Sequence, residues 1–395
     1  MPMEKNMSLN IPKIITESEN ELISLFKDFH VNPELGFEEK RTAQIIKNKL
    51  FEYGVDHIKS GIGITGVVGI IKGKKNSNRS VGIRADMDAL PIHEKTNLAY
   101  SSKIKGRMHA CGHDAHTTML LGAAKYLAST RCFKGSAVLI FQPAEEGLGG
   151  ALKMIADGVL KQFPCDEIYG IHNWPNQSPN KVEICVGPAM AGAAFFDIEI
   201  IGQGSHAAAP QNSKDPLLIA SSLVSQIQYI VSRNVPPLDT CVISITQLHA
   251  GSAYNVIPET AQIAGTIRYF SDTIFDLTNK RLEEICNGFE ICYSIKINLN
   301  IRKVFDVLVN DEDLSKSYIE AAADVVGEEN TNIGASPSTG SEDFADFLNV
   351  TPGAYCRLGH EGNVALHSPN FYLEPKSIFT GSAILSRIIE KRMPL

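Results

Sequence analysis

Long hydrophobic runs are missing from this 395-residue sequence. It contains no stretch of roughly 18 consecutive apolar residues, which a membrane-spanning helix would need. The opening segment MPMEKNMSLNIPKIITESEN also lacks the uninterrupted apolar core of a signal peptide. Repeats at a solenoid period and low-complexity tracts are absent as well. We therefore expect a cytoplasmic protein with no membrane partner.

An excess of positive charge is missing too. The chain has 37 Lys and Arg residues against 44 Asp and Glu residues, and its net charge is −7. A protein that binds the phosphates of nucleic acid normally presents a basic surface. The composition therefore argues against nucleic acid as a partner and is typical of an ordinary globular protein.

Paired cysteines are the third absence. The eight cysteines are scattered without paired spacing, which argues against a disulfide framework. In a reducing compartment most of them would act as small buried hydrophobic residues. Cys111 differs because it stands among three histidines in MHACGHDAH, residues 108–116. This segment could hold a metal, activate a thiol or form a polar loop before a helix.

The order of apolar segments predicts the fold. The length of the chain favours two domains. From residue 64 onward, short apolar runs typical of strands alternate with helical patterns, which predicts an α/β sheet with helices on its faces. We expect strands at 64–73, 80–86, 135–143 and 166–175, and helices at 117–127 and 150–163.

A second domain is indicated by a shift to Gly and Ala at residues 185–194. The patterns that follow have the order βαββαβ, which is the split ferredoxin-like unit. We interpret residues 188–301 as a domain inserted into a larger one that consists of residues 1–187 and 302–395.

Reactive side chains follow the expected strands of the larger domain. Asp86 and Asp88 follow VGIR, Glu145 and Glu146 follow AVLIFQ, and His172 ends EIYGIH. In open α/β sheets, ligands bind in the crevice beyond the carboxyl ends of the strands. These segments, far apart in sequence, should therefore meet at one rim of the sheet.

A metal site is the first hypothesis for that rim. Cys111 and His113 alternate in the chain, so they would face the same way in an extended loop. Glu146, His172 and, near the C-terminus, His367 could complete the cage. A mixture of thiolate, imidazole and carboxylate ligands suits Zn²⁺ best, with Mn²⁺, Co²⁺ and Ni²⁺ as alternatives.

The glutamate pair in PAEEG indicates catalysis. One carboxylate is enough for the metal, which leaves the other free as the general base of a metal-assisted hydrolysis. Spacing alone leaves open which of Glu145 and Glu146 has which role.

Each of these patterns can also arise where there is no site. Two adjacent glutamates usually form a solvated turn, and a single Cys-x-His pair usually binds nothing. The combination at strand ends is what favours a site. The remaining histidines are interpreted as surface or core residues, and the HVNPELG turn accounts for the first of them: His30, His57, His93, His249 and His360.

The other side chains of MHACGHDAH have separate interpretations. A nucleophilic Cys111 is disfavoured because His113 lies too close in sequence to act as an independent base. His109 receives no role, Asp114 is expected to cap the following helix, and His116 should lie in its first turn.

With these residues identified, the sequence resembles the hippurate hydrolase and auxin-conjugate amidohydrolase branch of the aminoacylase/carboxypeptidase-G metallopeptidase superfamily. The similarity extends from about residue 30 to residue 370. The matching segments, in order, are HVNPELGFEE, GIRADMDALP, MHACGHDAH, FQPAEEGLGGA, GIHNWP, GQGSHAAAP, AYNVIPETAQIAGTIR, GSEDFADF and ALHSP.

The resemblance implies a mixed-sheet catalytic domain with a dinuclear metal centre. It implies that Glu145 is the general base and acid, and that Asp88 orients a metal ligand without binding the metal itself. Two divalent metal ions, Zn²⁺ or Mn²⁺, would be bound by Cys111, His113, Glu146, His172 and His367, with Cys111 as the bridge.

The resemblance also implies a role for the inserted domain as a lid that mediates homodimerisation. His206 of one subunit would reach the active site of the other and stabilise the oxyanion. Asn255 and Arg268 would bind the carboxylate of the substrate.

We therefore expect metal-dependent hydrolysis of an N-acyl amino acid of the hippurate type. Deacetylation of N-acetyl-diaminopimelate or another N-acetyl amino acid is the alternative within the same class. From other classes, an inactive amino-acid binder and a thiol hydrolase remain as alternatives.

Overall fold

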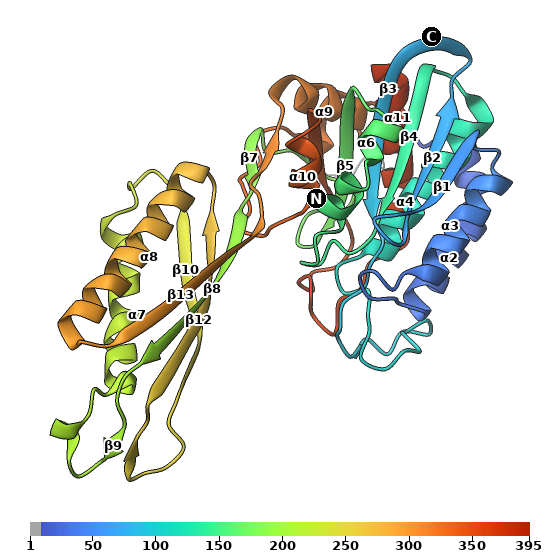
Figure 1. Cartoon of the computed structure of the whole chain (residues 1–395). Coiled ribbons are helices and arrows are strands. Elements are labelled where there is room, and N and C mark those ends of the chain that lie inside the picture. The colour runs from blue at the N-terminus through green and yellow to red at the C-terminus, as the bar shows by residue number, and fades with distance from the viewer. Residues whose placement is uncertain (1–8) are drawn as a thin grey trace, which may run out of the picture. The chain divides into compact units, whose positions relative to one another are not determined.

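Two compact units make up the chain, and each is described by itself (Figure 1). The computed structural model describes residues 9–395. The first unit consists of residues 9–189, 309–336 and 343–395, and the second consists of residues 190–308 and 337–342.

The first unit contains an eight-stranded mixed sheet. In sheet order its strands are β1 (His57–Ile62), β2 (Gly66–Lys72), β4 (Lys134–Gln142), β3 (Lys75–Asp86), β5 (Glu167–Trp174), β16 (Gly353–Gly359), β6 (Val182–Glu183) and β15 (Thr331–Asn332). The strands β4, β3, β5 and β16 are parallel, whereas β2 and β6 run antiparallel to their neighbours β4 and β16. Strands β4, β5 and β16 and the second half of β3 consist mostly of buried residues, as expected where helices cover a sheet. The α/β fold with a mixed sheet is thus confirmed.

Helices pack around this sheet (Figure 1). They are α1 (Lys13–Glu17), α2 (Glu19–Val31), α3 (Lys40–Glu52), α4 (His113–Thr130), α5 (Gly150–Ala156), α6 (Val159–Gln162), α9 (Glu312–Val326), α10 (Phe344–Leu348) and α11 (Lys376–Arg392). Helices α4 and α11 approach closely because glycine stands on both: a Cβ at Gly122 would lie 2.3 Å from Ser382 Oγ, and one at Gly381 would lie 2.3 Å from Met119 Sδ. Within the described residues, no helix is long and apolar enough to cross a membrane.

The second unit has the order βαββαβ around a four-stranded antiparallel sheet. Its elements are β8 (Gly192–Ile201), α7 (Pro216–Arg233), β10 (Cys241–Ala250), β12 (Thr260–Tyr269), α8 (Asp272–Tyr293) and β13 (Lys296–Phe305), with a small ribbon of β9 (Ser205–His206) and β11 (Val256–Ile257). Alternate residues of β8 and β12 are buried against the two helices. This alternation explains the period-2 pattern of the sequence. A further ribbon is formed by β7 (Gly187–Met190) and β14 (Leu308–Asn310).

The bounds of the second unit differ from the boundaries expected at residues 188 and 301. Strand β13 continues to Phe305, so the expected end of the inserted domain falls within a strand. The short segment 337–342 also belongs to this unit although it lies about 30 residues further along the chain. A compositional shift cannot reveal a segment of six residues.

Two helices of the first unit also differ from expectation. The single helix expected at 150–163 is divided into α5 and α6 because Gly158 adopts a left-handed conformation, with φ of 80°. Helix α4 begins earlier than expected, at His113, and its N-cap is Gly112. Asp114 therefore lies inside the first turn, and its expected role as the cap is wrong.

Candidate metal centre and active site

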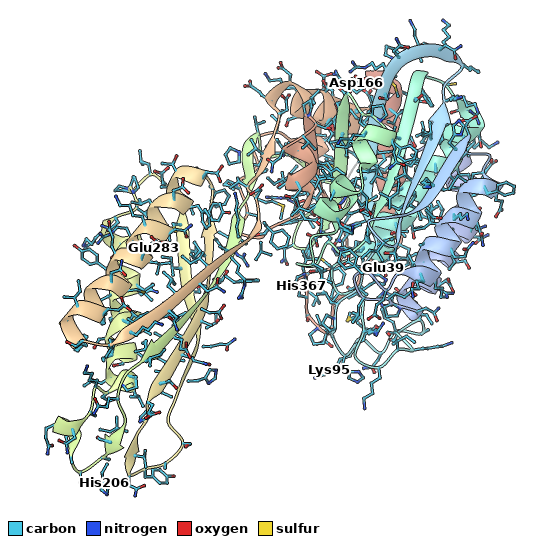
Figure 2. All side chains as sticks on the ribbon, in the orientation of Figure 1. Glu39, Lys95, Asp166, His206, Glu283 and His367 are labelled. Carbon is cyan, nitrogen blue, oxygen red and sulfur yellow. The ribbon has the colours of Figure 1, made fainter. Side chains whose placement is uncertain are left out.

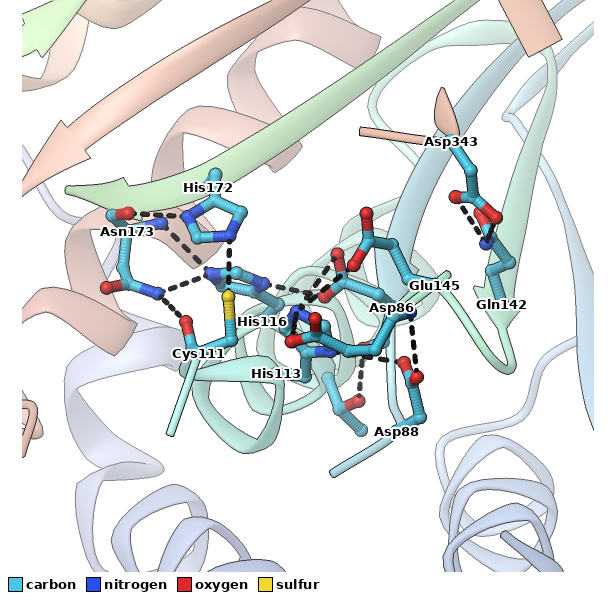
Figure 3. A network of polar contacts seen from close by, with 12 residues as sticks. Asp86, Asp88, Cys111, His113, His116, Gln142, Glu145, His172, Asn173 and Asp343 are labelled. Atoms are coloured by element: carbon cyan, nitrogen blue, oxygen red, sulfur yellow. Dashed lines mark hydrogen bonds and ion pairs between the residues drawn. The ribbon is translucent and has the colours of Figure 1, made fainter. Parts of the chain in front are cut away.

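The predicted residues of the first unit meet beyond the carboxyl ends of three neighbouring strands (Figure 3). Strand β3 leads to Asp86 and Asp88, β4 leads to the Glu145–Glu146 turn, and β5 carries His172 near its end. The fourth contribution comes from the start of α4, where Cys111 and His113 lie. The parallel arrangement of the strands is what brings these segments together.

Two groups of possible ligand atoms share the sulfur of Cys111. In the first, Cys111 Sγ lies with His113 and His172, and in the second it lies with Glu146 and His367. The ligand atoms within each group all lie within 4.8 Å of one another. The five residues of the sequence hypothesis are therefore close neighbours, and Cys111 is common to both groups.

The histidine rings are oriented with one nitrogen facing the centre. Asp88 Oδ1 lies 3.2 Å from Nδ1 of His113, and the backbone oxygen of Asn173 lies 2.5 Å from Nδ1 of His172. A proton on Nδ1 leaves the lone pair of Nε2 available in both rings. The Nε2 atom of His172 lies 3.4 Å from Cys111 Sγ.

Two buried atoms of the centre, one of them without a hydrogen-bond partner, indicate that a cation fits. Nε2 of His113 is buried without a hydrogen-bond partner among the described residues, and the buried Oε1 of Glu146 has an ion-pair contact of 3.4 Å with Nε2 of His367. A buried polar atom without a partner is energetically costly. Together with a thiolate and further imidazoles, these atoms form a donor set that suits Zn²⁺ and other borderline divalent cations.

Asp88 connects two parts of the centre. Besides contacting His113, its Oδ2 accepts a hydrogen bond of 3.1 Å from the backbone amide of Glu146. One carboxylate thus orients an imidazole and also holds the backbone of the glutamate turn. This placement agrees with a supporting rather than a ligating residue.

The burial of Cys111 and the negative charge near it favour a bound cation over a reactive thiol. Burial and the charge of Glu146 raise the pKa of the Cys111 thiol. A reactive cysteine needs a lowered pKa, so the thiol nucleophile is disfavoured. Hydrogen bonds to Cys111 and Glu146 raise the pKa of His367 to about 10, which reflects a strongly negative environment around its ring.

Glu145 lies beside the ligand groups. Its carboxylate is 6% exposed, and its Oε2 lies 4.0 Å from Nε2 of His113. Glu145, Glu146 and His113 also form one cluster of neighbouring ligand atoms. The turn therefore presents two carboxylates to the same centre.

The family is decided by comparison with known sequences. Residues 82–391 match the profile of Peptidase family M20/M25/M40, which is more than half of the chain. The chain belongs to this family.

Several relatives of this M20 protein have the names of enzymes that act on N-acyl amino acids. It is 41% identical to the hippurate hydrolase of Campylobacter jejuni over 96% of this chain and 98% of that one. It is 40% identical to the IAA-amino acid hydrolase ILR1-like 2 of Arabidopsis thaliana, over 92% of this chain and 83% of that one. A solved structure from Bacillus subtilis, described as a dinuclear metal binding peptidase of the M20 family, is 32% identical with a TM-score of 0.82 and covers 95% of this chain and 98% of its own. The resemblance to the hippurate hydrolase branch is confirmed.

A chain of hydrogen bonds behind the ligands of this M20 protein was not predicted from the sequence. The backbone amide of Asn173 donates to Nε2 of His116 at 2.9 Å, so Nδ1 of that ring donates to Asp86 at 2.6 Å. The side-chain amide of Asn173 donates to the carbonyl oxygen of Cys111 at 2.6 Å (Figure 3). Only the position of His116 in the first helical turn was expected.

A buried arginine connects this series of hydrogen bonds to the end of β4. Arg84 is 1% exposed and donates to Asp86 at 2.7 Å, to Gln142 at 2.7 Å and to Asp343 at 3.1 Å. Asp343 also accepts hydrogen bonds from Gln142 (Figure 3). The signal in the sequence was an arginine within the predicted strand VGIRAD, and GSEDF supplies its distant partner Asp343.

His30 is more than a residue of a surface turn. It lies in α2, is 3% exposed, and its Nδ1 lies 2.7 Å from Asp114 Oδ2. Its Nε2 lies 3.3 Å from Glu94. Asp114 thus pairs with His30 and does not cap α4. His109 is also buried, without a hydrogen-bond partner for its ring among the described residues, and burial lowers its pKa to about 4.

Three predicted residues belong to the second unit. His206, labelled in Figure 2, lies in the β9–β11 ribbon, and the backbone amide of Ala208 donates to its Nδ1 at 3.1 Å. The carbonyl of Asn255 accepts from the amide of Ala207 at 3.0 Å, so His206 and Asn255 are neighbours. Arg268 lies on β12, and its Nη1 is buried without a hydrogen-bond partner in the described part of the chain.

Proposed function

We propose that this M20 protein is a metal-dependent amidohydrolase that cleaves the amide bond of an N-acyl amino acid of the hippurate type. The products are a carboxylic acid and an amino acid. One observation carries the proposal: two groups of ligand atoms share the sulfur of Cys111, and a second carboxylate, Glu145, lies beside them. A protein that only bound an amino acid would have no use for that second carboxylate.

Five residues would hold the metal. The two ions are proposed to be Zn²⁺ or Mn²⁺, with Co²⁺ and Ni²⁺ as alternatives, because the donor set is borderline in softness. When bound, such ions lower the pKa of water and polarise the substrate carbonyl. The residues that would bind the ions are Cys111, His113, Glu146, His172 and His367, and Cys111 belongs to both groups of ligand atoms.

Glu145 is proposed to carry the proton through the reaction. Its carboxylate takes a proton from water as water attacks the amide carbon, and it returns the proton to the nitrogen of the leaving amine. Glu145 is only 6% exposed and lies beside His113 and Glu146, which limits its contact with bulk water. Asp88 keeps the ring of His113 and the backbone of Glu146 in place meanwhile.

Residues of the second unit are proposed to bind the substrate. Because Nδ1 of His206 accepts a backbone hydrogen bond, the neutral ring carries its proton on Nε2, which can donate to the oxyanion. Arg268 offers an unpaired guanidinium nitrogen that suits a carboxylate, and Asn255 would add an amide donor. The second unit would then act as a lid and dimerisation domain.

The decisive experiment compares Glu145→Gln with the wild type after reconstitution with Zn²⁺ or Mn²⁺. We expect the variant to keep its metal content but to lose at least about 100-fold in kcat on hippurate, the usual scale for removing a general base. Glu146→Gln serves as the matched control, since it removes a ligand and should lower the metal content. Retained turnover in Glu145→Gln would refute the role of this residue.

The same assay tests the substrate class. A panel of hippurate, N-acetyl amino acids and N-acetyl-diaminopimelate should give the highest kcat/KM for hippurate. A preference for the acetylated substrates would support the deacetylase alternative instead. Metal binding without turnover of any member would support an inactive binder.

A further inference from the structure

Glu39 is a buried carboxylate that has no part in the proposed reaction. It is 0% exposed and stands as the N-cap residue immediately before α3 (Figure 2). Its Oε1 accepts a hydrogen bond of 2.9 Å from the backbone amide of Ala144, and its Oε2 accepts one of 2.6 Å from Thr65 Oγ1. Burial raises the pKa of Glu39 to about 7, against the opposing hydrogen bond from Thr65. A group so costly to bury is expected to have a specific task.

Glu39 binds the backbone of Ala144, the residue whose conformation orients Glu145 and Glu146. Ala144 directly precedes Glu145 and Glu146 and has a φ of 53°, a left-handed conformation that residues with a Cβ rarely adopt. Such a conformation persists only where its surroundings enforce it. Here the amide of Ala144 is bound by Glu39, and its carbonyl accepts from the amide of Gly150 at 3.0 Å.

Close packing adds to this control. Gly36, three residues before Glu39, lies so near the turn that a Cβ on it would stand 3.0 Å from both Cα and Cβ of Ala144. The segment 36–39 therefore holds Ala144 by a hydrogen bond and by direct contact. A change on either side would shift the backbone that carries Glu145.

Residues that precede this segment contact two further parts of the centre. The amide of Ala89, next to Asp88, donates to the carbonyl of Glu34 at 2.8 Å. His30 contacts Asp114, which is next to His113, at 2.7 Å. Residues 30–39 thus contact the segments next to Asp88, His113 and Glu145, although none of them belongs to a group of possible ligand atoms.

We propose that residues 30–39 brace the metal centre from outside and that Glu39 is a positioning residue for Glu145 and Glu146. This inference rests on the proposed function. Glu39 acts by holding the left-handed turn at Ala144, so that one carboxylate of the pair faces the ligand groups as a ligand and the other as the base.

Two substitutions of Glu39 test the proposal in the metal-reconstituted protein. Glu39→Leu removes the acceptor for the Ala144 amide, and we expect about a 10- to 100-fold loss in kcat with little change in KM, as is common for residues that orient ligands. Glu39→Gln keeps a carbonyl oxygen that can accept from Ala144, so it should restore kcat to within about threefold of the wild type. Equal loss of kcat in both variants would overturn the proposal.

Thr65→Val is the matched control because it removes the other hydrogen bond of the same carboxylate without touching the turn. A merely structural Glu39 predicts that Glu39→Leu and Thr65→Val lower kcat in proportion to their loss of unfolding free energy. The positioning role predicts that Thr65→Val keeps kcat. If Glu39→Leu does not fold, Gly36→Ala displaces the turn from the same side, and wild-type kcat in that variant would overturn the proposal.

Metal titration separates this inference from the proposed function. The affinity for Zn²⁺ should fall about 10-fold or more in Glu39→Leu and should stay unchanged in Thr65→Val, since Glu146 depends on the same turn. This result needs no turnover. If the wild type hydrolyses no N-acyl amino acid, the proposed function fails while the titration still decides the role of Glu39. Unchanged affinity in Glu39→Leu would overturn it.

Discussion

At the scale of single residues, hydrogen bonds to one atom of a side chain determine which other atom can bind a cation. Asp88 and the carbonyl of Asn173 occupy one nitrogen in each of His113 and His172, and the opposite nitrogens face Cys111 and its neighbours. The raised pKa of the thiol means that sulfur binds metal with release of a proton. Metal affinity is therefore expected to fall as the solution becomes more acidic.

His30 supplies a pH-dependent prediction at this scale. Burial lowers its pKa, but contacts with Asp114 and Glu94 outweigh burial and raise the pKa to about 9 from an ordinary 6.5. The protonated ring therefore stabilises the fold fully below pH 6.5, and this contribution is lost as the pH rises through 9. His30→Gln should lower the free energy of unfolding most near pH 6 and least above pH 9, in urea titrations at both ends.

The control for this prediction is His57→Gln, which alters an exposed histidine of β1. Its effect should be small at every pH. A destabilisation by His30→Gln that grows with pH would contradict the charged pair.

The site residues that could be predicted from the sequence lie in short motifs, whereas those that could not be predicted have partners far away in the sequence. Cys111, His113 and Glu146 could be proposed because short motifs place several reactive groups together. His30 and Asp114 are 84 residues apart, and Arg84 and Asp343 are 259 residues apart. Each of these partners looks like an ordinary charged residue by itself, and only the fold brings the two together.

At the scale of elements, the site is built where strands end and the chain turns. The apolar runs of β3, β4 and β5 predicted the strands, and the parallel order followed from the alternation with helices. The left-handed turn at Ala144 could not be predicted, because alanine carries no sign of a positive φ. The contribution of α2 and of the N-cap of α3 was hidden for a different reason, because their contacts with the site are long-range in sequence.

The connection from β4 to α5 gives a prediction for Gly150. A Cβ at this residue would lie 1.7 Å from the backbone oxygen of Pro143, which cannot move without shifting Ala144 and Glu145. Gly150→Ala should lower the free energy of unfolding by about 1–3 kcal/mol, the usual range for overpacking, and should also lower kcat on hippurate.

Gly288→Ala is the matched control for Gly150→Ala. Gly288 lies inside α8 with open space around its Cα, so alanine should stabilise that helix by about 0.5–1 kcal/mol and leave kcat unchanged. Thermal unfolding and steady-state turnover measure both effects. Wild-type turnover in Gly150→Ala would show that the turn tolerates displacement.

At the scale of the whole molecule, the chain divides its tasks between two units. The proposed ligands and Glu145 all belong to the first unit, whereas His206, Asn255 and Arg268 belong to the second. The sequence indicated this division through its shift to Gly and Ala at residues 185–194 and through the βαββαβ order of the patterns that follow. It could not indicate that residues 337–342 join the second unit, because a short return segment has no periodicity of its own.

The proposal that His206 acts on the site of a partner subunit leads to a mixing experiment. Glu145→Gln and His206→Ala should each be nearly inactive alone. If His206 acts across a dimer, the two variants produced together will form mixed dimers in which one site has both its own Glu145 and an intact partner His206. With random pairing, half of the dimers are mixed and one of the two sites in each mixed dimer is complete, so about one quarter of wild-type turnover should return.

A mixture of Glu145→Gln and Glu146→Gln is the control that should show no rescue, because both changes damage the same unit. If Glu145→Gln and His206→Ala also show no rescue although mixed dimers form, His206 serves its own subunit.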